Sequence, residues 1–168
     1  MSPSARRESP RQYPLDFGKF STFVETVDCP EIEEPSRRLL AAMRYSGVVE
    51  IEYKRDPRNG APKLLDINAR YWAWHSLGRR TGVDFPYMQW RAAHGEAFPE
   101  MKMRTGGRWV RGLTDVMAAA LAMRAGLLTP TRYLASIQPA LEYAIFAFDD
   151  PMPFLADIPL MALRHVTG

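Results

Sequence analysis

The sequence predicts an α+β fold in which an antiparallel sheet is flanked by helices and followed by a helical C-terminal extension. Two strand-like runs, 48–54 and 63–69, are joined by a short segment rich in turn residues. A third run from Phe20 alternates in strand fashion, and residues 30–45 carry apolar side chains at helical spacing. With 168 residues, 46% of them hydrophobic, the chain is long enough for one domain with a core and a dependent appendage.

The first expected elements are a strand and a helix. The strand begins near Phe20, after the break Asp16-Phe17-Gly18. Acidic residues and prolines then gather at the start of residues 30–45, where the helix dipole favours negative charge, and Gly47 follows the apolar positions. We therefore expect a helix from about Pro30 to Tyr45.

The most informative segment is the predicted β-hairpin. Its loop contains Asp-Pro and Asn-Gly pairs, which are strong turn signals. A loop of residues 58–60 sets Glu52 opposite Asp66. Because side chains alternate along a strand, a loop of odd length brings Glu52, Asp66 and Asn68 to the same face.

Downstream, helices are expected in residues 70–82, in a shorter segment ending near Gly95, from Thr114 to Gly126, and from Thr131. Residues 144–168 contain repeated prolines and predict an irregular, apolar tail. The expected organisation is a flexible basic segment 1–12, a subdomain 13–96 and a helical and irregular extension 97–168.

Composition narrows the function classes. The net charge is only +3 and part of it lies in Arg6, Arg7 and Arg11, so a flexible basic end is favoured over a nucleic-acid-binding arm. Cys29 is the single cysteine, which excludes an intramolecular disulfide framework and a cysteine-rich zinc site. The sequence has neither a signal-peptide pattern nor an apolar run of membrane-spanning length, so we expect a cytoplasmic protein without a membrane partner.

Glu52, Asp66 and Asn68 are the candidate metal ligands. Carboxylate and amide oxygens suit Mg²⁺ or Mn²⁺, and magnesium fills its remaining positions with water and phosphate oxygens. Arg70 follows on the same face, where its guanidinium can neutralise a phosphate. Acidic faces are also common on solvent-exposed hairpins, so these residues alone leave a purely structural interpretation open.

The run from Gly47 to Arg70 resembles the signature of the ATP-grasp superfamily, of the carbamoyl-phosphate synthase and biotin carboxylase type. That signature is a strand with an acidic or amide residue, a turn, and a strand of the form acid-x-Asn-x-Arg. By this resemblance Glu52 is the first metal ligand, Asp66 the bridging second and Asn68 the third. The resemblance covers about residues 10–96 and implies the C-terminal portion of an ATP-grasp fold.

The resemblance implies an ATP- and Mg²⁺-binding carboxylate-amine ligase. In such enzymes ATP phosphorylates a small carboxylate substrate, and an amine or another nucleophile attacks the acyl phosphate. Arg70 would stabilise charge as the catalytic residue, and Asn68 would contact the nucleotide. Arg11 is a further candidate for contact with the nucleotide phosphates or the substrate, although a solvated side chain is the favoured interpretation of Arg11. The chain departs from the family pattern at Asp66, commonly glutamate, and at Ala69, commonly proline.

The larger departure is the missing phosphate-gripping part. The sequence contains no GxGxxG or Walker-type loop. We therefore expect a partial enzyme, with a separate chain possible as the source of the N-terminal half. The alternative function is a non-catalytic remnant or interaction module that retains the fold.

Other residues have competing interpretations. His75 is either an acid or base near the site or a packed histidine, and at least one of Trp72 and Trp74 should lie in the core. Asp149 and Asp150 are read as turn or capping residues rather than as a second metal site. Glu25 and Glu50 are candidates for supporting positions behind the ligands.

Overall fold

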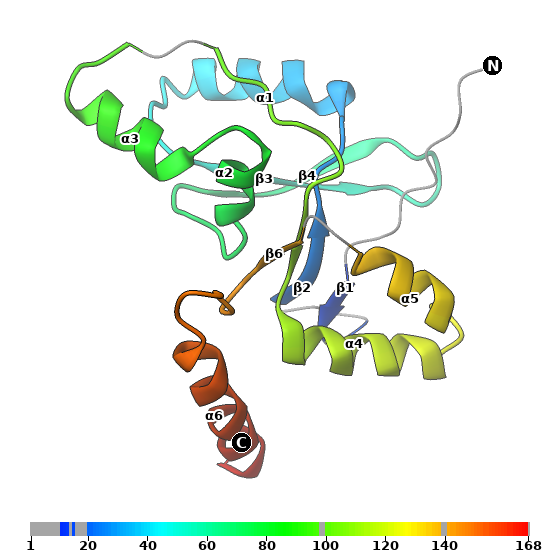
Figure 1. Cartoon of the computed structure of the whole chain (residues 1–168). Coiled ribbons are helices and arrows are strands. Elements are labelled where there is room, and N and C mark those ends of the chain that lie inside the picture. Colours follow the sequence, from blue (N-terminus) through cyan, green and yellow to red (C-terminus); the bar gives the residue numbers. More distant parts are fainter. Residues whose placement is uncertain (1–10, 14, 16–19, 98–99, 139–140, 168) are drawn as a thin grey trace. The chain divides into compact units, whose positions relative to one another are not determined.

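The computed structural model describes residues 11–13, 15, 20–97, 100–138 and 141–167. The chain divides into two compact units (Figure 1). Unit 1 combines residues up to Glu25 with those from Gly107 onward, and unit 2 comprises Thr26–Gly106. Both contain helices and strands, which confirms the mixed α+β class. The predicted division into 1–12, 13–96 and 97–168 stays a prediction.

Unit 1 is built on a four-stranded sheet in the order β1-β2-β5-β6. Its strands are β1 (Arg11–Tyr13), β2 (Phe20–Glu25), β5 (Arg108–Val110) and β6 (Leu141–Tyr143). β1 pairs antiparallel with β2, β2 antiparallel with β5, and β5 parallel with β6. The strand expected from Phe20 is confirmed, whereas three residues each in β5 and β6 are too few to show a period-2 pattern.

The helix α4 (Gly112–Arg124) packs against β1 and β2. Its buried alanines, Ala118, Ala119 and Ala122, have short side chains and therefore let the helix lie close to the sheet. On the sheet, Phe23 and Trp109 are both 2% exposed and form the bulk of this core.

The helix boundaries of unit 1 differ from two expectations. α4 begins two residues before Thr114, whose hydroxyl donates to the carbonyl oxygen of Arg111, so Thr114 is not the N-cap. Gly126, with φ of 71°, follows the helix end as expected. The short helix expected from Thr131 is α5 (Pro130–Ser136), capped by the hydroxyl of Thr129.

The prediction of an irregular C-terminal tail is wrong for most of that segment. Residues 152–167 form the helix α6 (Met152–Thr167), which contains Pro159. Pro151 and Pro153 lie next to or within its first turn, where the missing N–H costs no intrahelical hydrogen bond. The proline at 139 lies outside the described residues.

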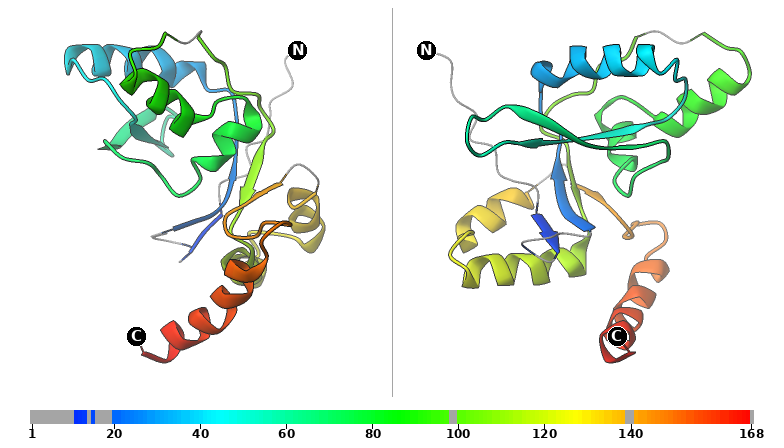
Figure 2. Two further views of the ribbon diagram at one scale, coloured as in Figure 1. Left: turned by 60° about the vertical axis from the view of Figure 1, so that its left-hand side comes forward. Right: turned by 180° about the vertical axis from the view of Figure 1, so that it is seen from behind.

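Unit 2 contains one helix, a β-hairpin and two further helices (Figure 2). The elements are α1 (Pro30–Ala42), β3 (Glu50–Arg55), β4 (Pro62–Asn68), α2 (Ser76–Thr81) and α3 (Phe85–Ala93). The three buried hydrophobic residues among those described here are Trp72, Leu77 and Val83. Gly82, with φ of 109°, ends α2 in the left-handed conformation, as the sequence predicts.

The hairpin has the predicted pairing but reaches it by a different route. The loop holds four residues, 57–60, because the amide of Asp56 bonds the carbonyl of Ala61. Tyr53 accordingly pairs with Leu64, but Glu52 pairs with Asp66, so Leu65 is the extra residue of a β-bulge. The bulge compensates for the even loop and returns Glu52 and Asp66 to the same face.

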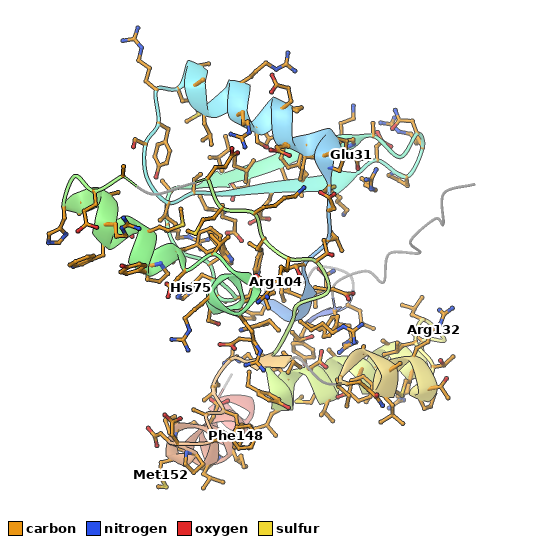
Figure 3. All side chains as sticks on the ribbon, turned by 45° about the horizontal axis from the view of Figure 1, so that its top comes forward. Glu31, His75, Arg104, Arg132, Phe148 and Met152 are labelled. Carbon is orange, nitrogen blue, oxygen red and sulfur yellow. The ribbon has the colours of Figure 1, made fainter. Side chains whose placement is uncertain are left out.

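One face of the hairpin is covered by α1. The hydroxyls of Ser36 on α1 and Tyr53 on β3 are 3.0 Å apart. At the beginning of α1, Glu31, which is labelled in Figure 3, forms an ion pair with Arg55, the last residue of β3. Since side chains alternate along β3, Glu50 and Glu52 lie on the face opposite Tyr53.

Candidate functional site

The candidate site is the hairpin face that carries the acidic side chains. β3 supplies Glu50 and Glu52, and β4 supplies Asp66 and Asn68. The backbone pairing sets Glu50 opposite Asn68 and Glu52 opposite Asp66. Four polar side chains therefore occupy two adjacent cross-strand pairs, and we call them the carboxylate face.

Hydrogen bonds hold parts of this face in place. The amide nitrogen of Asn68 donates to Oε1 of Glu52 over 3.2 Å. The backbone N–H of Ile67 donates to Oδ1 of Asp66 over 2.9 Å. In the described part of the chain, Oδ2 of Asp66 makes no hydrogen bond, and both Glu52 and Asp66 are exposed. These two carboxylates can therefore be reached from solvent.

The electrostatics of the face are those of crowded negative charge. Burial raises the pKa of the Glu50 carboxyl above its ordinary value, and the carboxylates of Glu52 and then Asp66 add to the shift. The guanidinium of Arg70 and a hydrogen bond from Asn68 act in the opposite direction. The neighbouring carboxylates that disfavour the ionised form of Glu50 would also attract a cation to this face.

The oxygen atoms of this face are the kind of ligand that a hard divalent cation prefers, but they are not all oriented to bind one. Glu52 and Asp66 offer carboxylate oxygens on paired strands, as Mg²⁺ requires. Asn68 directs its nitrogen toward Glu52, so its oxygen must turn by rotation of the amide before it can ligate. Among the described residues, no group of three or more His, Cys, Asp or Glu side chains is arranged to hold a metal ion.

Arg70 lies at the end of the face, in the turn after β4. Its backbone N–H donates to the carbonyl of Asn68 over 2.9 Å, which closes a tight turn. Its Nη1 donates to the carbonyl of Tyr71 over 3.3 Å and lies 3.9 Å from Oε2 of Glu50. The side chain is 64% exposed, so the guanidinium can still contact an anion.

Arg11 is engaged elsewhere, in unit 1. Its Nε and Nη2 donate to the two carboxylate oxygens of Asp115 over 2.8 and 2.7 Å, and Nη1 donates to the hydroxyl of Ser136 over 2.7 Å. The side chain is only 10% exposed. The interpretation of Arg11 as a solvated side chain is therefore wrong, and its contact with a nucleotide stays a prediction.

The other residues considered in the sequence analysis take part in packing, hydrogen bonds or ion pairs. Trp72 is 9% exposed, which confirms that one of the two tryptophans of this segment is in the core. His75, labelled in Figure 3, donates from Nδ1 to the carbonyl of Trp72 over 2.8 Å. Asp150 accepts a hydrogen bond from the N–H of Met152, two residues further on at the start of α6, as expected of a turn residue. Glu25 pairs with Arg108 within unit 1.

Sequence reasoning missed the Arg11–Asp115 ion pair altogether. Asp115 lies in an apolar helix and is 104 residues from Arg11 in the chain. A carboxylate inside an apolar helical run was the available signal, because a buried charge needs a partner.

Comparison with protein-family models, with curated proteins and with solved structures gave no match. No helix in the described part of the chain is long and apolar enough to cross a membrane.

Proposed function

We propose that this chain is part of an ATP-grasp enzyme of the carboxylate-amine ligase type and that its carboxylate face binds Mg²⁺ on the phosphates of ATP. The observation that carries the proposal is the pairing of Glu52 with Asp66, next to that of Glu50 with Asn68. It supports the proposal because the residues that resemble the ATP-grasp ligands are adjacent in space as well as ordered in sequence.

In this proposal Glu52, Asp66 and Asn68 hold Mg²⁺ or Mn²⁺. The metal ion, when bound, neutralises phosphate charge and fixes the orientation of the phosphates. Arg70 contributes a second positive charge at the edge of the face, where 64% of its side chain is accessible. The residues thus position and neutralise the group that is transferred to a small carboxylate substrate.

The proposal includes a partner that completes the nucleotide site. Unit 2 carries side chains from only two strands at its carboxylate face. Gripping the triphosphate requires further donors, which in the ATP-grasp family come from an upstream lid. The cytoplasm is the proposed location, since a sequence with one cysteine, Cys29, forms no intramolecular disulfide and ATP is the proposed substrate.

A second candidate is the non-catalytic interaction module. It is favoured by one observation, namely that the carboxylates of the described residues are not arranged as a ready metal site. Under this alternative the hairpin is retained for the fold, and the acidic side chains are a solvated face.

Isothermal titration calorimetry with Mg·ATP distinguishes the two. The lone wild-type chain is expected to bind Mg·ATP weakly, at millimolar concentration, because the donors of the lid are not part of unit 2. Asp66→Asn is expected to weaken that binding at least tenfold, about 1.4 kcal/mol, because it removes the charge of one ligand. Glu34→Gln is the matched control, since Glu34 is exposed on α1 and paired with Arg38. No heat from the wild-type chain at millimolar Mg·ATP, with its fold intact, would support the interaction module instead.

A further inference from the structure

Glu50 differs from the other carboxylates of the face in its surroundings. Its side chain is 14% exposed, whereas Glu52 and Asp66 are exposed. It stands opposite Asn68 in the pairing of β3 with β4. A sheltered carboxylate on a paired strand is a fixed anchor, and it is less accessible to a cation than its two exposed neighbours.

Arg70 needs such an anchor. An arginine side chain loses rotamer entropy when it is held in one conformation, and a partner that already restricts it reduces that loss. Arg70 sits in the turn beyond β4, and its own contacts are local, with the carbonyls of Asn68 and Tyr71. Among the described residues, Arg70 forms an ion pair with Glu50, on the neighbouring strand, at 3.9 Å from Nη1 to Oε2.

We propose that Glu50 is a positioning residue, which holds the guanidinium of Arg70 at the edge of the carboxylate face so that it meets a metal-bound triphosphate. This inference rests on the proposed function and adds a residue that the ATP-grasp resemblance does not assign. Glu50 itself touches neither the metal nor the phosphate. It lowers the entropy that Arg70 loses when the nucleotide binds.

The direct readout needs no nucleotide. NMR relaxation of the ¹⁵Nε–H group of Arg70 measures how strongly the motion of the guanidinium is restricted. Glu50→Gln is expected to raise the mobility of this group to that of an exposed arginine, whereas Glu34→Gln leaves it unchanged. An Arg70 signal equally mobile in the wild type and in Glu50→Gln, with hairpin amide shifts preserved, would overturn the inference.

The functional readout is a double-mutant cycle of Mn·ATP affinity with Glu50→Gln and Arg70→Met. In the wild-type background, we expect Glu50→Gln to weaken binding of Mn·ATP about tenfold. In the Arg70→Met background, the loss of Mn·ATP affinity caused by Glu50→Gln should exceed the loss of affinity for Mn²⁺ alone by less than twofold. Equal losses in both backgrounds mean that Glu50 acts independently of Arg70, which contradicts the inference. Absence of Mn·ATP binding by the wild type contradicts the proposed function instead, and the relaxation measurement still tests the Glu50–Arg70 contact.

Discussion

The ion pair between Arg11 and Asp115 should dominate the stability of unit 1. Asp115 is 0% exposed and accepts three hydrogen bonds, from Nε and Nη2 of Arg11 and from the hydroxyl of Thr22, at 2.7–2.9 Å. Asp115→Ala leaves a guanidinium that is 10% exposed without its counter-charge. Breaking a buried pair in this way costs about 3–5 kcal/mol. The orphaned Thr22 hydroxyl is included in that range, because neighbouring losses are not additive.

The free energy of unfolding can be followed by urea denaturation with ¹⁹F NMR of 5-fluorotryptophan at Trp109, which is 2% exposed in the same unit. Asp149→Ala, at an exposed aspartate of unit 1, is the control and should change stability by less than about 0.5 kcal/mol. Replacing both partners by apolar residues, Arg11→Met with Asp115→Leu, should recover most of the loss. A loss below about 1 kcal/mol for Asp115→Ala would refute the reasoning, since the pair would then be solvated.

Three further predictions concern unit 2. Deletion of Leu65 should remove the bulge but leave Glu52 opposite Asp66, so that Mn²⁺ binding is retained. Deletion of Ile67 should move Asn68 to the other face of the hairpin and abolish Mn²⁺ binding. Electron paramagnetic resonance of Mn²⁺ distinguishes the two results. Gly78→Ala places a Cβ 2.5 Å from the carbonyl oxygen of Val83, so thermal denaturation should show a loss of about 1–3 kcal/mol in the free energy of unfolding. Gly112→Ala is the control and should be tolerated, because the nearest atom to its Cβ is 3.6 Å away. The side-chain hydrogen bond from Arg58 lowers the pKa of Asp56. The stabilising effect of this hydrogen bond is therefore present above the pKa of Asp56 in the unfolded chain, about 3.9, and is lost as the pH falls through the lower pKa of the folded state. The difference in stability between the wild type and Asp56→Asn should disappear at low pH.

The hairpin was predictable because its information is local. The turn pairs Asp-Pro and Asn-Gly and the alternation of flanking residues lie within 22 residues, 48–69, and they fix two strands and their partners. The predicted odd number of loop residues was nevertheless wrong. The pairing of Glu52 with Asp66 was predicted correctly only because the bulge at Leu65 compensates for the four-residue loop. A bulge leaves no strong mark in the sequence, since any residue of strand character can occupy it.

Unit 1 was less predictable because its pairing is between distant segments. β2 pairs with β5, and Glu25 faces Arg108 across 83 residues of chain. A strand of three residues such as β5 has no detectable period, and it becomes a strand through its neighbours. Arg11 reads as part of a basic end for the same reason, since its partner Asp115 lies in a distant helix.

Selective broadening of amide signals by Mn²⁺ tests most directly whether Glu52, Asp66 and Asn68 form a cation site. If they do, the amides of these three residues broaden first, ahead of the exposed acidic pair Asp149 and Asp150, and Asp66→Asn removes the selectivity. Broadening that is equal at both acidic segments, or that is unchanged in Asp66→Asn, would contradict the proposed cation site.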